Sequence, residues 1–149
     1  MIEEAFVLDA SITATWLLPD EHTGASQALF ARLRGGVLDV HVPDIWLAEC
    51  GNIIASAVKR RRATVVEADA LWRVLDAVRV RITRFELGPT QWRAALALAF
   101  ERRLSIYDAS YLWLAVSLQL PLCTDDERLA KAAIAQGVPV LTVNLRGLP

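Results

Sequence analysis

Short apolar runs alternate along the chain with longer segments of helical periodicity. The apolar runs lie at Ala5–Leu8, Val40–Val42, Val78–Thr83, Leu120–Cys123 and Pro139–Thr142. The helical segments cover Ser11–Leu18, Glu21–Leu33, Asp44–Arg61, Val65–Ala77, Thr90–Arg103, Tyr107–Gln119 and Asp126–Gln136. Strands that alternate with helices are typical of an α/β fold with a parallel sheet. We therefore predict an α/β fold, in a single domain over residues 1–149.

The third apolar run, Val78–Thr83, alternates apolar and polar side chains, with Arg79 and Arg81 at polar positions. Such alternation is typical of a strand with one solvated face, and outward arginines discourage pairing with another sheet. We predict an edge strand here.

The composition is that of a globular chain, with 54% hydrophobic and 22% charged residues. The net charge is −1 and the pI is about 6.1, so the molecule as a whole does not attract nucleic acid. No apolar run approaches the ~20 residues that cross a bilayer. The acidic start, Met1-Ile2-Glu3-Glu4, lacks the basic region of a signal peptide, so we expect a cytoplasmic protein without a membrane segment.

The chain is also rich in tryptophan, at Trp16, Trp46, Trp72, Trp92 and Trp113. These side chains fit either an aromatic core or a surface that a second chain covers. Cys50 and Cys123 lie in apolar stretches, as buried thiols of a reducing compartment do, and one disulfide between them is compatible with the sequence.

Four acidic residues stand out by their positions. Asp9 and Asp126 follow the first and fourth predicted strands, at the carboxyl edge where open α/β sheets bind ligands. Asp108 lies at the start of a predicted helix. Glu49 lies inside an apolar helix, on a narrow polar stripe with Asn52 and Ser56 at i, i+3 and i+7.

Each of these acids also has a purely structural interpretation. Asp108 could complement a helix dipole behind an N-cap at Ser105, and Asp9 could be a turn former or an N-cap. Thr124-x-x-Glu127 has the form of a capping box, with Asp125 and Asp126 in the first helical turn. Glu49 fits such an interpretation least well, because unpaired carboxylates on apolar helix faces are rare.

Taken together, the acids predict a metal site. Two like charges about 4 Å apart repel by roughly 4 kcal/mol at an effective dielectric near 20, so a carboxylate cluster takes up protons or binds a cation. Oxygen ligands without histidine or thiolate favour Mg²⁺ or Mn²⁺. Such a metal can activate water and neutralise charge on a phosphodiester, which makes phosphodiester hydrolysis the leading chemistry.

Other sites have less support. His22 and His41 are too few for a histidine-rich zinc site, and the chain has neither a G-x-S-x-G nucleophile elbow nor a G-x-x-x-x-G-K-[ST] phosphate loop. The basic run Lys59–Arg62 ends a predicted helix, where it either complements the dipole or steers a phosphate backbone toward the site.

Four segments, in this order, resemble the PIN-domain nucleases, and among them the VapC-type toxins of prokaryotic toxin–antitoxin pairs. They are Val7-Leu8-Asp9-Ala10-Ser11 with Trp16–Glu21, Val42–Asn52, Ser105–Tyr111 with Leu114-Ala115, and Leu122–Leu129. The resemblance implies a three-layer PIN-like fold, in which helices flank a central parallel sheet of order 3-2-1-4-5. It implies an acidic, metal-holding site of Asp9, Glu49, Asp108 and Asp126, with Asp126 rather than Asp125 as the fourth acid. Thr124, Ser11 and Asn52 would support that site.

The function that the resemblance implies is a Mg²⁺- or Mn²⁺-dependent endoribonuclease, the toxin of a type II toxin–antitoxin system. Its partners would be an RNA substrate, such as tRNA or mRNA, a cognate antitoxin protein and a second copy in a homodimer. The alternatives are a non-toxin PIN nuclease, another Mg²⁺-dependent phosphoryl-transfer domain, and a non-catalytic binding module. A receiver domain needs a lysine after its last strand, which Val143–Arg146 lacks, and a haloacid-dehalogenase phosphatase needs Asp-x-Asp where this chain has Asp9-Ala10-Ser11.

Overall fold

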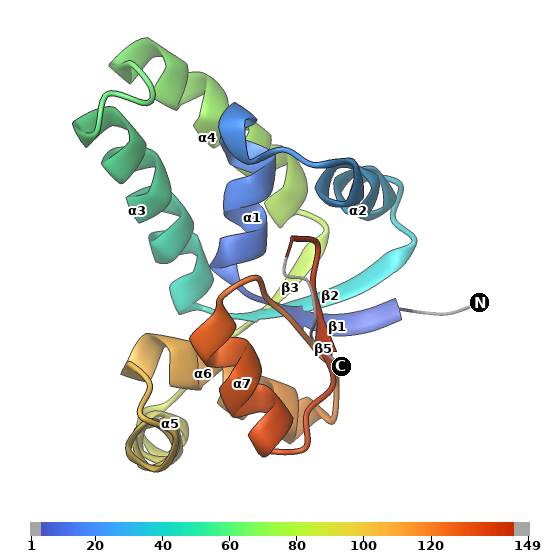
Figure 1. Cartoon of the computed structure of the whole chain (residues 1–149), viewed down its shortest axis with the longest axis vertical. Helices are drawn as coiled ribbons and strands as arrows, with labels where there is room; N and C mark the ends of the chain where they lie inside the picture. The colour runs from blue at the N-terminus through green and yellow to red at the C-terminus, as the bar shows by residue number, and fades with distance from the viewer. Residues whose placement is uncertain (1–3, 145–149) are drawn as a thin grey trace.

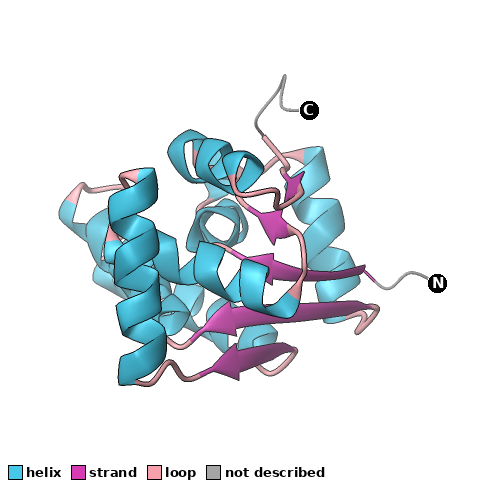
Figure 2. Cartoon of the chain, turned by 90° about the horizontal axis from the view of Figure 1, so that it is seen from below, coloured by secondary structure: helices cyan, strands magenta, loops and turns pink. Residues whose placement is uncertain are grey.

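The computed structural model describes residues 4–144, and a parallel five-stranded sheet forms its centre. The spatial order of the strands is β3-β2-β1-β4-β5, and all four pairings are parallel. Figure 2 shows the strand arrows pointing in the same direction. The strands are β1 (Glu4–Leu8), β2 (Leu38–Pro43), β3 (Ile82–Phe85), β4 (Leu122–Cys123) and β5 (Val140–Leu141).

Helices cover both faces of the sheet, which gives the three layers that we predicted. In Figure 1 the helices α1 to α4 lie on one side of the strands and α5 to α7 on the other. Among residues 4–144, none of these helices combines the length and apolar character that a bilayer crossing requires. The helices are α1 (Ala10–Leu17), α2 (Gly24–Arg34), α3 (Ile45–Lys59), α4 (Val65–Arg79), α5 (Pro89–Arg102), α6 (Ile106–Leu118) and α7 (Glu127–Ala135), with a 3-10 turn at Pro19–Glu21.

The α/β class and the strand order are confirmed, but the third strand begins later than predicted. Val78 and Arg79 belong to α4, whose buried face continues from Leu75 to Val78 at helical spacing. Val80, which the strand interpretation would bury, is 71% exposed. The alternating pattern therefore joined the end of a helix to the start of a strand. β3 is still an edge strand, because it pairs with β2 alone.

The second predicted helix also begins later, at Gly24 rather than Glu21. Pro19–Glu21 forms the short 3-10 turn instead. Thr23 then caps α2 reciprocally: its hydroxyl accepts from the backbone N–H of Ser26 at 3.0 Å, and its own N–H donates to the Ser26 hydroxyl at 2.9 Å. This capping box starts the helix three residues after the predicted position.

Most of the tryptophans belong to the core. Trp46 and Trp16 are buried, and Trp92 and Trp113 pack against the core cluster. Trp72, on α4, is the partly exposed exception at 39%. Aromatic burial thus accounts for most of the tryptophan content. Both cysteines, Cys50 and Cys123, are buried free thiols, so the disulfide left open by the sequence is not formed.

The sheet brings the ends of β1 and β4 together. Leu8 and Cys123 are register partners, and the backbone N–H of Asp9 donates to the carbonyl of Cys123 at 2.9 Å. The N–H of Thr124 similarly donates to Leu141 of β5 at 3.0 Å. Asp9 and Thr124 therefore leave the same edge of the sheet as neighbours, although 115 positions separate them in the sequence.

Candidate acidic site

A single pocket at the carboxyl edge of the sheet brings together the four predicted acids. They come from different elements: Asp9 follows β1, Glu49 lies on α3, Asp108 is in the first turn of α6, and Asp126 precedes α7. The residues that line the pocket are Asp9, Ala10, Ser11, Glu49, Asn52, Ile53, Asp108 and Asp126. Ser11 and Asn52, predicted as supporting residues, thus lie in the same pocket. Thr124 is not among the lining residues but donates a hydrogen bond to Asp9.

Asp9 is almost fully buried, with 5% of its surface exposed. It occupies the N-cap position of α1, but its side chain makes no capping hydrogen bond. Instead its Oδ2 accepts a hydrogen bond of 2.8 Å from the hydroxyl of Thr124. The residue that follows the neighbouring strand β4 therefore holds the Asp9 carboxylate toward the pocket.

Ser11 links the start of α1 to the segment after β4. Its Oγ accepts a hydrogen bond of 3.0 Å from the backbone N–H of Asp125 and lies 3.3 Å from Oγ1 of Thr124. Thr124 in turn accepts from the N–H of Asp126 at 3.0 Å. Two hydroxyls thus fix the backbone that carries Asp126 relative to Asp9.

The capping box that the sequence suggested at Thr124 is wrong. The N-cap of α7 is Asp126, whose Oδ1 accepts from the backbone N–H of Leu129 at 2.8 Å. Thr124 does not cap the helix, because its hydroxyl is engaged by Asp9 and by the N–H of Asp126. The N-cap lies two residues after the one that the capping box suggested, and Asp126 both caps the helix and lines the pocket.

Asp125 faces away from the other acids. Its Oδ1 accepts hydrogen bonds from the hydroxyl of Thr142 at 2.5 Å and from the backbone N–H groups of Val143 and Asn144 at 3.0 and 3.2 Å. Asp125 therefore ties the segment after β5 to the start of α7. Of the two adjacent aspartates, Asp126 lines the pocket.

Asp108 and its helix follow the predicted cap. The Ser105 hydroxyl accepts from the N–H of Asp108 at 3.0 Å, so Ser105 is the N-cap of α6. Asp108 lies in the first turn of α6, as its structural interpretation has it, and it also lines the pocket.

Glu49 has a partner that the sequence analysis missed. The phenol of Tyr111, itself fully buried, donates a hydrogen bond of 2.5 Å to Oε1 of Glu49. Tyr111 lies three residues after Asp108 on α6, and residues three apart share one face of a helix. That spacing was the available signal, since it turns Tyr111 toward the same site as Asp108.

The pocket disfavours the charged form of its carboxylates. Burial raises the pKa of Glu49 to about 7 and that of Asp108 to about 6, and the negative charge of Asp9 adds to both shifts. Burial also raises the pKa of Asp9, against the opposing effect of hydrogen bonds from Ser11 and Thr124. The carboxylates would be easier to ionise if a cation offset their mutual repulsion.

The donor atoms of the pocket suit a hard divalent cation. Across residues 4–144, no three His, Cys, Asp or Glu side chains are grouped so that they could hold a metal ion as they stand. The lining nevertheless includes four carboxylates and neither histidine nor cysteine, which is the ligand chemistry of Mg²⁺ or Mn²⁺. Because Mg²⁺ commonly keeps several waters and takes only one or two carboxylates, separated carboxylates are compatible with a hydrated ion.

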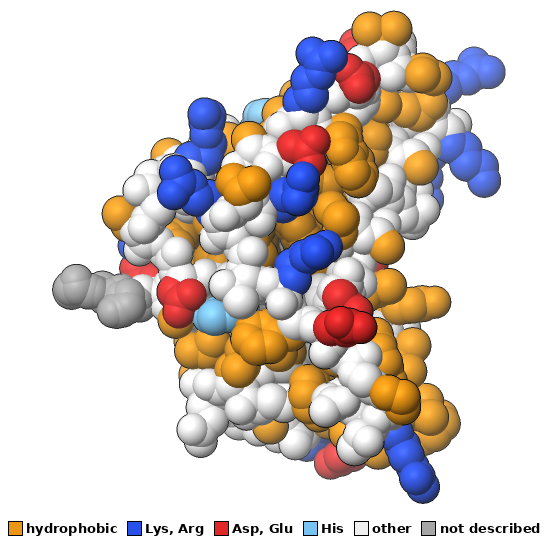
Figure 3. All heavy atoms as spheres, turned by 180° about the vertical axis from the view of Figure 1, so that it is seen from behind, with side chains coloured by type: hydrophobic (Ala, Val, Ile, Leu, Met, Phe, Trp, Pro, Cys, Tyr) orange, Lys and Arg blue, Asp and Glu red, His pale blue; other side chains and the backbone are white. Residues whose placement is uncertain are grey.

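With a net charge of −1, the protein as a whole offers a polyanion no broad electrostatic attraction. On the face drawn in Figure 3, basic and acidic side chains are interspersed. This agrees with the net charge of −1. Any affinity for a polyanion therefore depends on local groups near the acidic pocket.

Solved structures share this fold. PAE2754 from Pyrobaculum aerophilum matches with a TM-score of 0.68 and 24% identity, over 93% of this chain and 83% of that one. VapBC2 from Rickettsia felis, bound to a DNA fragment from its promoter, matches with a TM-score of 0.65 and 12% identity, over 94% of this chain and 99% of that one. FitAcB from Neisseria gonorrhoeae matches with a TM-score of 0.63 and 18% identity, over 91% of this chain and 96% of that one. At these identities the likeness shows the fold alone. No curated relative matches the chain in sequence.

The family comparison covers most of the chain. The family model described as the PIN domain matches residues 6–135, from within β1 to the end of α7. All four pocket carboxylates lie inside this stretch. The observed strand order is the one that the resemblance implied. The resemblance itself is confirmed at the level of the family: this chain belongs to the PIN-domain family.

Proposed function

We propose that this protein is a Mg²⁺- or Mn²⁺-dependent endoribonuclease. The observation that carries the proposal is the convergence of Asp9, Glu49, Asp108 and Asp126 on one pocket. Membership of the PIN-domain family supports the assignment as a nuclease. Dependence on a metal and the choice of RNA rest on the chemistry of the pocket and on the sequence resemblance.

The four acids would have two different roles at the site. Asp9 and Asp108 would be the principal metal ligands, and Glu49 and Asp126 would be further ligands or would orient the attacking water. A bound Mg²⁺ or Mn²⁺ would make water a better nucleophile and offset the charge that develops on the phosphodiester. In the reaction water adds to phosphorus and one P–O ester bond breaks, which leaves a phosphate end and a hydroxyl end. Glu49, with its pKa near 7, is suited to accept the proton of that water at neutral pH.

The direct test compares wild type with Asp9→Asn on a mixed RNA substrate, with Mg²⁺, with Mn²⁺ and with EDTA. We expect cleavage by wild type with either metal, none in EDTA, and a severe loss in the variant. Equal cleavage by both proteins that resists EDTA would exclude a metal nuclease at this site. A matched control is Asp125→Asn, which changes the adjacent carboxylate that faces away from the pocket.

We further propose that the chain is the toxin of a toxin–antitoxin pair, works in the cytoplasm and forms a homodimer. The support is the sequence resemblance to VapC-type toxins and the shared fold of VapBC2. Expression alone should slow bacterial growth, and co-expression of an antitoxin gene from the neighbouring reading frame should relieve it. Harmless expression of an RNA-cleaving protein would favour the alternative, a PIN nuclease that is not a toxin. Light scattering of the purified protein tests the homodimer.

A further inference from the structure

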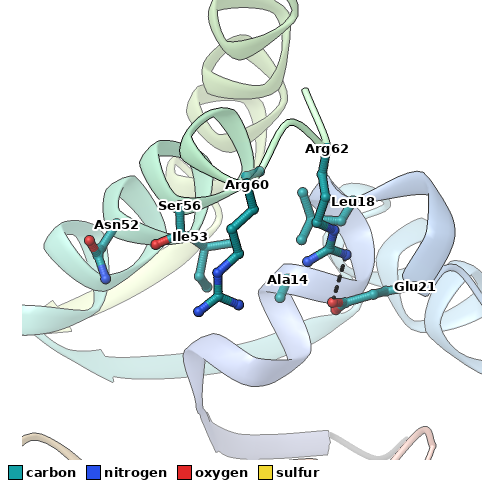
Figure 4. Close-up of a pocket in the computed structure, with 9 residues that line it drawn as sticks. Ala14, Leu18, Glu21, Asn52, Ile53, Ser56, Arg60 and Arg62 are labelled. Carbon is teal, nitrogen blue, oxygen red and sulfur yellow. Dashed lines mark hydrogen bonds and ion pairs between the residues drawn. The ribbon is translucent and has the colours of Figure 1, made fainter. Parts of the chain in front are cut away.

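A second pocket continues the acidic pocket along α3. Asn52 and Ile53 line both pockets. The second pocket adds Ser56 on α3 and Arg60 at the C-cap of α3, and Ala14 on α1 also lines it. Figure 4 shows Arg60 reaching from the end of α3 into the space toward α1. We call this second pocket the Arg60 groove; its lining also includes Leu18, Glu21, Ala57 and Arg62.

The polar residues of the groove form one stripe with the acidic site. Glu49, Asn52, Ser56 and Arg60 follow one another at i, i+3, i+7 and i+11. At about 100° per residue, position i+11 returns to within about 20° of position i after three turns. At 1.5 Å per residue, Arg60 lies about 16 Å further along the axis than Glu49. The sequence stripe that ended at Ser56 therefore extends to a guanidinium at the C-cap of the helix.

The polar side chains of the stripe beyond Glu49 lack partners within the protein. Among residues 4–144, the side chains of Asn52, Ser56 and Arg60 make neither a hydrogen bond nor an ion pair. Arg62, across the same groove, differs: it pairs with Asp20 at 2.8 Å and with Glu21 at 3.1 Å. The charge of Arg60 is thus the uncompensated cation of the groove, beside two neutral hydrogen-bonding groups.

We propose that the Arg60 groove binds the sugar–phosphate backbone of the RNA strand next to the bond that is cut. Arg60 would hold a phosphate through its guanidinium fork, and Asn52 and Ser56 would bind ribose or phosphate oxygens. This inference rests on the proposed ribonuclease function and adds a binding subsite to it. Because the acidic pocket repels a polyanion and the net charge is −1, the substrate needs a local cation, and Arg60 supplies one on the same helix face.

An acidic segment of a protein partner would also suit a guanidinium. The continuity of the groove with the acidic pocket favours RNA, because one strand can pass from the scissile phosphate to Arg60 without leaving the stripe. Two neutral hydrogen-bonding side chains between the two ends suit the repeating oxygens of a nucleic acid backbone.

The test measures binding of a fluorescein-labelled single-stranded RNA by anisotropy, in EDTA, between 50 and 200 mM salt. The proteins are wild type, Arg60→Gln, Arg60→Lys and Arg61→Gln. Arg61 is the matched control, because it is exposed, adjacent and lines a different pocket. We expect Arg60→Gln to weaken binding roughly tenfold and to lower the slope of log K against log salt by about 0.7, the value for one phosphate contact on a single strand. Arg60→Lys should keep that slope, and Arg61→Gln should bind as wild type does.

Equal affinities and slopes for Arg60→Gln and Arg61→Gln would overturn the proposal, as would wild type that binds no RNA. Unchanged RNA binding with a loss of antitoxin affinity in Arg60→Gln would also overturn it and would assign the groove to a protein partner. Melting curves of each variant ensure that folded proteins are compared. Cleavage by wild type with Mg²⁺ is measured in parallel. If wild type cleaves RNA but Arg60→Gln binds it as well as wild type does, only the binding subsite is excluded. If wild type binds RNA but does not cleave it, the ribonuclease function is excluded.

Discussion

The hydroxyl of Thr124 donates a hydrogen bond of 2.8 Å to Oδ2 of Asp9, from the end of β4 to the end of β1. The hydroxyl oxygen of Thr124 also accepts a hydrogen bond of 3.0 Å from the backbone N–H of Asp126. One fully buried side chain thus positions two of the four pocket acids relative to each other.

Thr124→Val keeps the shape of the side chain but removes both hydrogen bonds. We expect a loss of about 1–3 kcal/mol in unfolding free energy, because a buried carboxylate oxygen loses its donor. Cleavage of RNA should fall as well, because Asp9 and Asp126 lose their common support. Thr124→Ser is the matched control and should retain most of both properties. Denaturant unfolding and initial rates measure the two effects, and a Val variant equal to Ser would show that the hydroxyl has no positioning role.

Tyr111→Phe should change the pH dependence of cleavage. The phenol hydrogen bond lowers the pKa of Glu49, so its removal should raise that pKa above its present value of about 7. Cleavage that needs ionised Glu49 would then rise at a higher pH than in wild type. Rate profiles between pH 5.5 and 9 measure the shift, with Tyr107→Phe on the exposed side of α6 as control. Superimposable profiles would contradict a role of Tyr111 in setting the ionisation of Glu49.

Without metal, the protein should lose stability as the pH rises from about 4.5 to about 7. Over this range folded Glu49 keeps a proton that the unfolded chain releases, because its pKa rises from 4.5 to about 7 on folding. Asp108 acts in the same direction between 3.8 and about 6. Glu49→Gln should flatten this decline and melt a few degrees higher than wild type at pH 8 in EDTA. Melting curves across this pH range test the prediction. Glu86→Gln, at an exposed position, is the control and should lose stability with rising pH as wild type does.

Divalent metal should stabilise wild type by binding only the folded state. At a metal concentration 100 times the Kd, the gain is about 2.7 kcal/mol. Asp9→Asn and Asp108→Asn should lose most of this gain. Melting curves without divalent metal should show that both variants are folded. Calorimetric titration with Mn²⁺ should also release protons near pH 6.5, since ionised carboxylates are required for binding. A wild type that melts identically with Mn²⁺ and with EDTA would contradict a metal site.

The adjacent aspartates should separate into a structural and a functional residue. Asp126→Asn keeps a good N-cap for α7, so it should fold normally and cleave poorly. Asp125→Ala loses the acceptor of hydrogen bonds from Val143 and Asn144, so it should cost roughly 1–3 kcal/mol in stability and retain metal-dependent cleavage. Melting and turnover of the two proteins decide the assignment. The reverse result would place Asp125 in the pocket.

Several features of the protein follow from the sequence alone. The alternation of apolar runs with helical segments was sufficient for the α/β class, because period-2 and period-3.6 patterns reflect which faces are buried. The order of four family-like segments was sufficient for the PIN resemblance. It also singled out Asp9, Glu49, Asp108 and Asp126, which the structure places around one pocket. Local boundaries were less secure. Leu75 and Val78 continue a helix across a stretch that also alternates like a strand, and packing decided between them.

Tertiary structure alone decided how the site is held. A capping box at Thr124 was reasonable from local sequence, but the parallel pairing of β1 with β4 placed Asp9 within reach of its hydroxyl and left the cap to Asp126. Tyr111 likewise meets Glu49 only because the fold brings α6 and α3 to the same edge of the sheet, although the two residues are 62 positions apart in the sequence. Local propensities determine which elements form. Hydrogen bonds between residues distant in sequence depend on how those elements pack, and this chain holds its acids in place through such bonds.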